Sequence, residues 1–310
     1  MTEAKDVKEE QDIKAIQAID TMGRPSYFSH EVCKDLFTSW EYQQMAHSTF
    51  KGVMLKMGLK DGEEWRTNEG HATVEDYIKE MDEAGVQYTL ADQMLLWSYK
   101  EHRPICNLTV DTLAKLIEPG KGRIIGGAGY NPWRIEESLR DIEHAIKDLG
   151  FKYVWAHPLS FGMGHDNAKF YPLYQKCGEL GIPVCMQVGH SAEPLPSEWG
   201  HPYNCEEPVR DFPGTTFVLT HTGWPWVGEW VSTVWRYPNC YGNIGAYYPS
   251  GLDPMVIQRI RGQIRDKVMW ATNGLNMTRC KKEFLELPMK EDAQKLILRD
   301  TAIKVFNLKP

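Results

Sequence analysis

The chain has 310 residues, of which 42% are hydrophobic, 25% charged and 11% aromatic, and its formal net charge is −7. This composition is ordinary for a globular protein and argues against wholesale disorder. A net negative chain lacks the basic footprint of nucleic-acid binding, so we expect no nucleic-acid partner.

The first twelve residues, MTEAKDVKEEQD, are charged and predict a flexible arm rather than the apolar stretch of a signal peptide. No apolar run approaches the roughly 20 residues that cross a bilayer. The seven cysteines are scattered and never spaced as CxxC, which is typical of reduced thiols in a core. We therefore expect a cytoplasmic protein with no membrane partner.

A short strand-like run at 15–20 is followed by a long polar stretch that reaches about residue 72 and contains a predicted helix over 31–45. An insertion of this length is more often a lid or binding loop than a plain connection. We interpret residues 30–72 as lid-like, with residues 54–65 closing over a site. Thr73 then begins a helix with a capping-box pattern, and Gly85 ends it.

From residue 86 onward, apolar strand-like runs alternate with amphipathic helices. These runs are VQYTLADQM, RIIGGAGY, FKYVWAHP, IPVCMQVGH, TTFVLTHTG, NCYGNIGAY and DKVMWATNGL. Together with the first run they make about eight strands, and near-continuous apolar strands are typical of a parallel sheet covered on both faces. The sequence therefore predicts the α/β class and a (β/α)₈ TIM barrel, formed as a single domain over residues 13–310. The GGAGY run lacks the helix and spacing of a dinucleotide site.

Polar side chains follow the predicted strands. In a barrel of this kind the active site lies at the carboxyl ends of the strands, where such side chains converge. They include Asp20, Arg24, Asp92, His157, Gln187, His190, His221 and Asn273. Convergence of polar groups from several strands predicts a small-molecule site.

Large aromatic residues stand near the same strand ends, namely Trp97, Trp133, Trp224 and Tyr247. Core and rim packing is the commoner role of such residues. Their concentration at one mouth also suits an apolar slot for a flat or alicyclic ring, and we count them as candidate substrate-binding residues.

Several segments carry a further signal through their order and spacing. They are IDTMGRP, EDYIKEMDEAGV, GYNPW, AHP, LGIPVCMQVG, FPGTTFVLTHTG, YPNCYGNIGAY, KVMWATNGL and RDTAIKVFNL. In this order they resemble the landmarks of the amidohydrolase-related TIM-barrel family (amidohydrolase family 2), in the branch of resorcylate-type aromatic-acid decarboxylases, hydratases and lactone hydrolases. The resemblance covers nearly all of residues 15–308. It implies a small-molecule substrate and, as in many relatives, a homodimer.

The positions at which this family usually binds a metal carry other residues. The two first-strand histidines fall at Met22 and Arg24, the fifth-strand histidine at Gln187 and the eighth-strand aspartate at Asn273, whereas the sixth-strand histidine is kept as His221. A zinc-type site needs about three or four His, Cys or carboxylate ligands. Because a permanent cation also repels a divalent ion, we expect no metal and no cofactor.

The resemblance implies an acid/base role for His221, because decarboxylase relatives use the histidine at this position next to the metal. A histidine can move a proton near neutral pH. His190 is a second candidate catalytic group, while Gln187, Asn273 and His157 would orient the substrate. A structural role in the rim is the alternative for His157 and His190.

Arg24 is the candidate electrostatic anchor. Its guanidinium can grip a substrate carboxylate or a developing oxyanion in a bidentate way. Loss of the family's aspartate would leave this charge free, because a carboxylate beside Arg24 would blunt its pull on the substrate. The alternative is a structural ion pair with Asp20 or Asp92.

These observations predict a metal-independent enzyme that acts on a small cyclic or aromatic carboxylate or carbonyl compound. Lyase-type chemistry leads, as decarboxylation, hydration or another C–C or C–O cleavage. Hydrolysis of a lactone or cyclic ketone, with His221 or His190 as general base, stands second because nothing obvious lowers the pKa of water. A non-catalytic ligand-binding protein is the third hypothesis.

Overall fold

The computed structural model describes residues 13–25, 34–56, 60, 71–106 and 108–310, apart from the side chains of residues 53 and 54. The predicted arm at residues 1–12 and most of the predicted lid at 54–65 lie outside the described residues. None of the helices in the described ranges is long and apolar enough to cross a bilayer.

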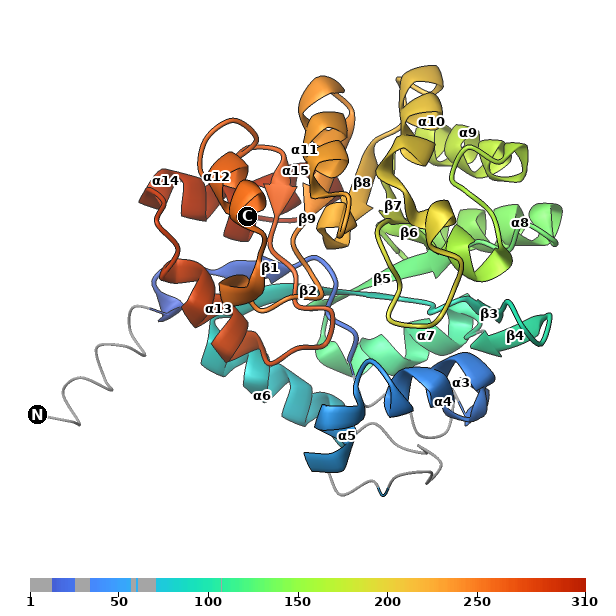
Figure 1. Ribbon diagram of the computed structural model, residues 1–310, viewed down its shortest axis with the longest axis horizontal. Coiled ribbons are helices and arrows are strands. Elements are labelled where there is room, and N and C mark those ends of the chain that lie inside the picture. The colour runs from blue at the N-terminus through green and yellow to red at the C-terminus, as the bar shows by residue number, and fades with distance from the viewer. Residues whose placement is uncertain (1–12, 26–33, 57–59, 61–70, 107) are drawn as a thin grey trace, which may run out of the picture.

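Eight parallel strands form one sheet that curls into a barrel (Figure 1). In sheet order they are β1 (Ala18–Asp20), β2 (Val86–Asp92), β5 (Ile124–Gly129), β6 (Tyr153–Ala156), β7 (Val184–Gln187), β8 (Phe217–Thr220), β9 (Cys240–Asn243) and β10 (Val268–Met269). The two edge strands meet at their carboxyl ends, where Thr21 N donates to Trp270 O (3.2 Å) and Asn273 N donates to Met22 O (2.7 Å). The predicted TIM barrel is confirmed.

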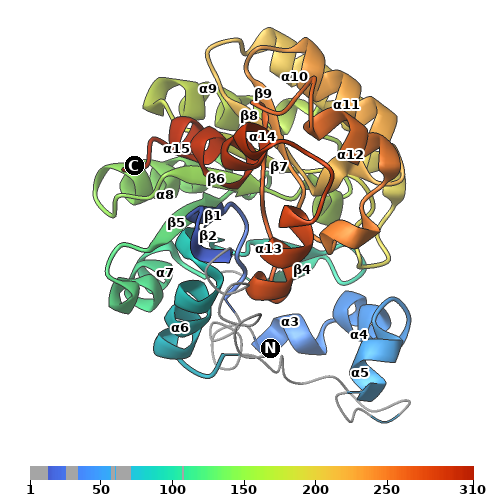
Figure 2. The same cartoon turned by 90° about the vertical axis from the view of Figure 1, so that its left-hand side faces the viewer.

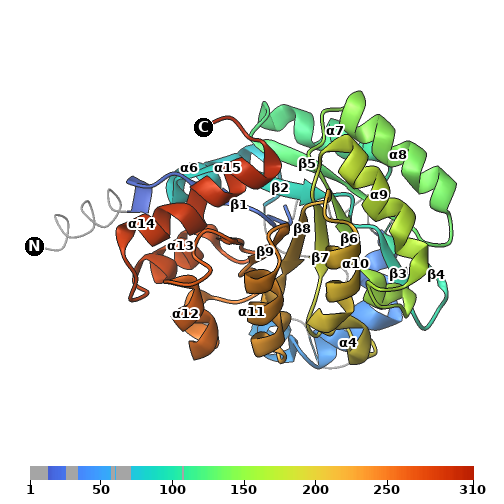
Figure 3. The ribbon, with the colours of Figure 1, turned by 90° about the horizontal axis from the view of Figure 1, so that it is seen from above.

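Helices cover the outer face of the sheet (Figures 2 and 3). They are α6 (Val74–Ala84), α7 (Val110–Ile117), α8 (Ile135–Lys147), α9 (Tyr171–Leu180), α10 (Glu206–Asp211), α11 (Val227–Arg236), α12 (Pro254–Ile260), α13 (Met277–Leu285), α14 (Glu291–Lys295) and α15 (Thr301–Phe306). Thr73 caps α6 as predicted, since Asp76 N donates to Thr73 Oγ1 (3.2 Å). The Asp76 carboxylate accepts from Thr73 Oγ1 (3.0 Å) rather than from Thr73 N, so the pattern gives half of a capping box. Gly85 ends α6 with φ 60°, a left-handed conformation that glycine adopts without strain.

The glycine run in β5 has a packing explanation. A Cβ at Gly126 would stand 2.4 Å from the ring of Phe151, and one at Gly127 would stand 2.3 Å from the ring of Tyr153. Both distances are far below van der Waals contact, so only glycine lets these rings pack against the strand. The run serves the barrel core, in keeping with the absence of a dinucleotide signature in the sequence.

The insertion after β1 folds into three short helices, α3 (Lys34–Thr38), α4 (Trp40–His47) and α5 (Lys51–Lys56). The helix predicted over 31–45 is therefore divided, because Ser39 ends α3 and caps α4. The insertion docks on a hairpin of β3 (Leu96–Ser98) and β4 (Arg103–Cys106), which the sequence pattern did not reveal. Buried Glu41 makes this contact, accepting from Ser98 Oγ (2.8 Å) and Lys100 N (3.0 Å).

Candidate active site

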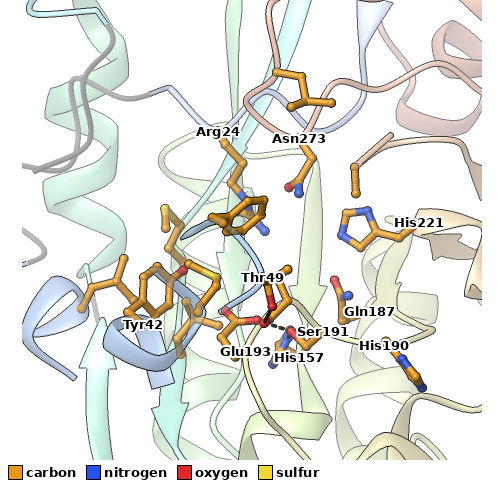
Figure 4. A pocket seen from close by; sticks show the side chains of 18 of the residues that line it. Arg24, Tyr42, Thr49, His157, Gln187, His190, Ser191, Glu193, His221 and Asn273 are labelled. Carbon is orange, nitrogen blue, oxygen red and sulfur yellow. Dashed lines mark hydrogen bonds between the residues drawn. The ribbon is translucent and has the colours of Figure 1, made fainter. Parts of the chain in front are cut away.

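A cavity of about 530 Å³, called the barrel pocket below, opens at the carboxyl ends of the strands (Figure 4). Seven barrel strands contribute lining residues at or just beyond their carboxyl ends: Arg24 after β1, Met94 after β2, His157 after β6, Gln187 at the end of β7, His221 after β8, Tyr247 after β9 and Asn273 after β10. The insertion adds a further wall with Leu36, Phe37, Tyr42, Met45, Thr49 and Phe50. Polar groups in a largely apolar cavity are the usual features of a small-molecule site.

Backbone strain is concentrated at this pocket. Five of its lining residues adopt positive φ, namely Arg24 (51°), Met94 (47°), His221 (67°), Ala246 (74°) and Asn273 (55°). Such conformations cost a non-glycine residue about 1–3 kcal/mol each and persist mainly where the surrounding structure requires them. These residues lie in sharp turns at the carboxyl ends of the strands. The strain therefore marks this end of the barrel as the candidate functional site.

Arg24 lies inside the barrel mouth with a carboxylate beside it. Its guanidinium carbon stands 4.3 Å from the centre of the Trp155 ring, and Nη1 donates to Asp92 Oδ2. The side chains are 16% and 3% exposed, so the ion pair is largely desolvated. Burial alone would lower the pKa of Arg24, but Asp92 more than compensates and the pKa is raised. The expectation that no carboxylate blunts this charge is wrong, and the alternative of an ion pair is realised with Asp92.

Asp20 does not pair with Arg24 but joins β1 to the segment that follows β10. Its Oδ1 accepts from Met22 N (3.1 Å) and Thr272 N (2.9 Å), and its Oδ2 accepts from Thr272 Oγ1 (2.6 Å). Burial raises the pKa of this carboxyl to about 6, against the opposing effect of these hydrogen bonds. Asp20 therefore holds β1 against the segment after β10.

Two buried histidines face the pocket. His221 and His157 are 7% and 5% exposed. Burial, and then the nearby charge of Arg24, lowers the pKa of each to about 3, so both rings are neutral at pH 7. His221 Nδ1 is buried without a hydrogen-bond partner among the described residues. An unsatisfied buried nitrogen at a pocket is costly unless a ligand or a proton compensates it.

The amides of Gln187 and Asn273 also line the pocket. Gln187 is buried, whereas Asn273 is half-buried. In the ranges that the structure describes, hydrogen bonds at Gln187 and Asn273 involve their backbone groups, and neither side-chain amide has a partner. Both are thus available to a ligand.

The remaining predicted residues separate into two groups. Trp224 and Tyr247 line the pocket, and so does His190 at its exposed rim. The His190 ring lies edge-on between Trp224 (5.4 Å between ring centres) and Trp226 (5.2 Å). In Figure 4 it points away from the other labelled side chains, which favours a rim role over a catalytic one.

Trp97 and Trp133 do not line the barrel pocket, contrary to expectation. Trp97 stacks on Phe161 with 5.6 Å between ring centres. Trp133 is 51% exposed, and Lys169 Nζ stands 4.9 Å from the centre of its ring. Both follow barrel strands in the sequence, but Trp97 lies in β3 of the hairpin and packs against the core, and Trp133 lies on the surface.

Three pocket groups escaped the sequence analysis. Trp155 points inward from the middle of β6, where we weighed only strand ends. Ser191 and Glu193 follow β7 by several residues, and Ser191 Oγ donates to Glu193 Oε2. The only available signal was the polar HSAE segment directly after IPVCMQVG.

The donor set at the strand ends does not suit a divalent metal. Met22 is buried in the core and does not line the pocket, Gln187 and Asn273 offer neutral amides, and Arg24 brings a positive charge to the centre. No group of three or more His, Cys, Asp or Glu side chains among the described residues could hold a metal ion. A zinc- or manganese-type site needs several such ligands, so these residues do not fit one.

Comparison with known proteins identifies the fold and the family. The model of the Amidohydrolase family matches residues 67–308. No curated protein matches the chain. Among solved structures, an uncharacterised TIM-barrel protein from Bordetella bronchiseptica is 23% identical with a TM-score of 0.70, and the match covers 94% of this chain and 98% of that one.

Two decarboxylases share the fold at lower identity. One is 2,6-dihydroxybenzoate decarboxylase from Rhizobium, with 13% identity, a TM-score of 0.59 and coverage of 94% of this chain and 98% of that one. The other is 5-carboxyvanillate decarboxylase from Novosphingobium aromaticivorans, solved with manganese and 4-hydroxy-3-methoxy-5-nitrobenzoic acid. It is 16% identical with a TM-score of 0.65, and the match covers 95% of this chain and 97% of that one.

Proposed function

The chain belongs to the amidohydrolase family, and from this premise we propose that it is a metal-independent enzyme acting on a small cyclic or aromatic carboxylate in the barrel pocket. The proposed chemistry is of the lyase type, with decarboxylation first. The observation that carries the proposal is the pocket itself, where a guanidinium, a neutral histidine and two unpartnered amides meet between aromatic walls. The likeness to two aromatic-acid decarboxylases supports the same class.

Arg24 would anchor the substrate carboxylate. Its Nη1 is committed to Asp92, which holds the guanidinium over Trp155. A guanidinium has five N–H donors, so the remaining ones can still bind a carboxylate. The amides of Gln187 and Asn273 would complete the hydrogen bonds of the substrate. Hydrogen bonds to an ionised carboxylate are roughly twice as strong as neutral ones.

His221 would supply the proton. In decarboxylation the bond between the ring carbon and the carboxylate breaks, CO₂ leaves, and the electron pair stays on the carbon until it takes a proton. His221 is neutral before binding because of burial and Arg24. An anionic substrate offsets the charge of Arg24 and favours the protonated ring, so the histidine would take up its proton together with the substrate.

Hydrolysis of a lactone remains the second candidate. A neutral imidazole can act as the general base for a water molecule, so the neutral state of His221 fits this reaction directly, whereas decarboxylation requires the ring to be protonated on substrate binding. His190 is the weaker base candidate because of its position at the rim. The two reactions release different products, CO₂ in one case and a hydroxy acid in the other.

The test uses the purified protein after exhaustive treatment with a chelator and elemental analysis for bound metal. It is incubated with aromatic and alicyclic carboxylic acids and with lactones, and CO₂ release and acid formation are followed. We expect turnover without metal, and loss of at least 100-fold in kcat for His221→Gln, in line with the usual contribution of general acid–base catalysis. Activity that returns only with added manganese or zinc, or full activity of His221→Gln, would overturn the proposal.

A further inference from the structure

The barrel pocket has a second polar group that the proposed chemistry does not use. It consists of Ser191 and Glu193 on the loop after β7, together with His157. Since β7 is the fifth strand of the closed eight-strand ring and β1 the first, this loop starts across the barrel from the loop that carries Arg24. In Figure 4 Glu193 and Ser191 lie below Arg24, whose side chain extends toward the middle of the pocket.

Hydrogen bonds orient this group and leave one carboxylate oxygen open. His157 Nδ1 accepts from Ser160 N (3.3 Å), so the neutral ring carries its proton on Nε2, which stands 3.5 Å from Ser191 Oγ. The Ser191 hydroxyl in turn donates to Glu193 Oε2. Glu193 Oε1 has no partner among the described residues, and Glu193 lines the pocket.

The loop is also held from the outside. Thr49 of the insertion donates from Oγ1 to the carbonyl oxygen of Ala192 (3.2 Å), which lies between Ser191 and Glu193 in the chain. Ala192 packs against a small apolar cluster of the insertion that contains Phe37, Met45 and Ala46. Glu193 is therefore placed by contacts on two sides.

The charges in the pocket decide what this end can bind. Arg24 and Asp92 cancel each other, and the two buried histidines are neutral at pH 7. Among the described lining residues, Glu193 is thus the one charge without an ionic partner. An unpaired carboxylate attracts a hydrogen-bond donor and repels a second anion.

We propose that Glu193, positioned by Ser191, is a specificity-determining residue that accepts a hydrogen bond from a ring hydroxyl or amino substituent and excludes substrates with a second carboxylate at that end. This inference rests on the proposed function, because it assumes that Arg24 holds the first carboxylate. On this proposal Glu193 selects a monocarboxylate that carries a hydrogen-bond donor and discriminates against dicarboxylates.

The experiment measures binding by quenching of tryptophan fluorescence and by calorimetry. The probes are benzoate, the three hydroxybenzoates, the matching aminobenzoates and methoxybenzoates, and the three benzenedicarboxylates. The variants are Glu193→Ala, Glu193→Gln and the matched control Glu198→Gln, which changes an exposed residue of the following segment. Circular dichroism and thermal melts verify that each variant is folded.

For the unchanged protein we expect at least one hydroxy- or aminobenzoate to bind roughly 10-fold more tightly than its methoxy analogue, the order expected for a hydrogen bond to a charged group. Glu193→Ala removes this ratio, and Glu193→Gln raises the affinity of at least one dicarboxylate roughly 10-fold by removing the repulsion. Glu198→Gln behaves as the unchanged protein. Ser191→Ala, which frees Glu193 to move, reduces the donor preference, and Ser191→Thr restores it.

The outcomes distinguish a failure of the proposed function from a failure of the inference about Glu193. If benzoate fails to bind, or binds equally well after Arg24→Met, the proposed function fails and this inference with it. If benzoate binding depends on Arg24 but no isomer shows a donor preference, or the preference survives Glu193→Ala, the inference about Glu193 alone is overturned.

Discussion

The ion pair between Arg24 and Asp92 offers a test in which stability and ligand affinity move in opposite directions. Asp92→Asn keeps the shape of the side chain but removes the negative charge that partners Arg24, in a setting where the two side chains are 3% and 16% exposed. At an effective dielectric of about 20, unit charges about 4 Å apart interact by about 4 kcal/mol. Breaking a buried pair costs about 3–5 kcal/mol, and Asn can still accept one hydrogen bond. We expect the free energy of unfolding to fall by about 3 kcal/mol.

The same substitution leaves a full positive charge at the pocket. A substrate carboxylate then supplies the missing counter-charge, so benzoate should bind about 10-fold more tightly and stabilise the variant more than the unchanged protein at equal concentration. Urea unfolding with and without benzoate measures both effects.

The matched control is Asp82→Asn, which breaks the exposed pair of Asp82 with Arg123, whose side chains are 63% and 30% exposed. Such a pair is worth only about 0–1 kcal/mol. The reasoning is refuted if Asp92→Asn costs no more than Asp82→Asn, or if it weakens benzoate binding.

Three further predictions follow from the same structure. Lys281 is fully buried and donates from Nζ to Ile16 O (2.7 Å), Ala84 O (2.8 Å) and Gly85 O (2.9 Å), so Lys281→Met should lower the free energy of unfolding by about 3 kcal/mol. The same change at exposed Lys282 should have little effect in urea unfolding. Burial raises the pKa of Asp20 from 3.8 to about 6; its contribution to stability is therefore present below pH 4 and is lost as the pH rises through 6. Between pH 4 and 7 this loss lowers the free energy of unfolding by about 3 kcal/mol. Asp20→Asn should remove this pH dependence, and an unchanged slope of unfolding free energy against pH would contradict the assignment. Trp224→Ala should weaken benzoate binding several-fold because Trp224 lines the pocket, whereas Trp133→Ala should not, and calorimetry that finds equal losses would argue against this pocket as the binding site.

The sequence by itself determined the barrel and the position of its mouth. Eight apolar runs alternating with amphipathic helices leave few arrangements other than a parallel sheet with covered faces. The carboxyl ends of parallel strands meet at one rim, so residues that end strands must gather there. This is why Arg24, Gln187, His221 and Asn273 could be assigned to one site from the sequence alone, and the structure places all four in the lining of the pocket.

Only the tertiary structure decided what each of these groups meets. The partner of Arg24 is 68 residues away in the chain, and periodicity cannot choose between Asp20 and Asp92, which both end strands. The loops beyond the strand ends follow no regular period. They leave Trp133 on the surface, place Trp97 in the β3–β4 hairpin away from the pocket lining and bring Glu193 into the lining. Local patterns set the faces of helices and strands because they depend on neighbouring residues, whereas ion pairs and loop paths depend on distances across the barrel that exist only after folding.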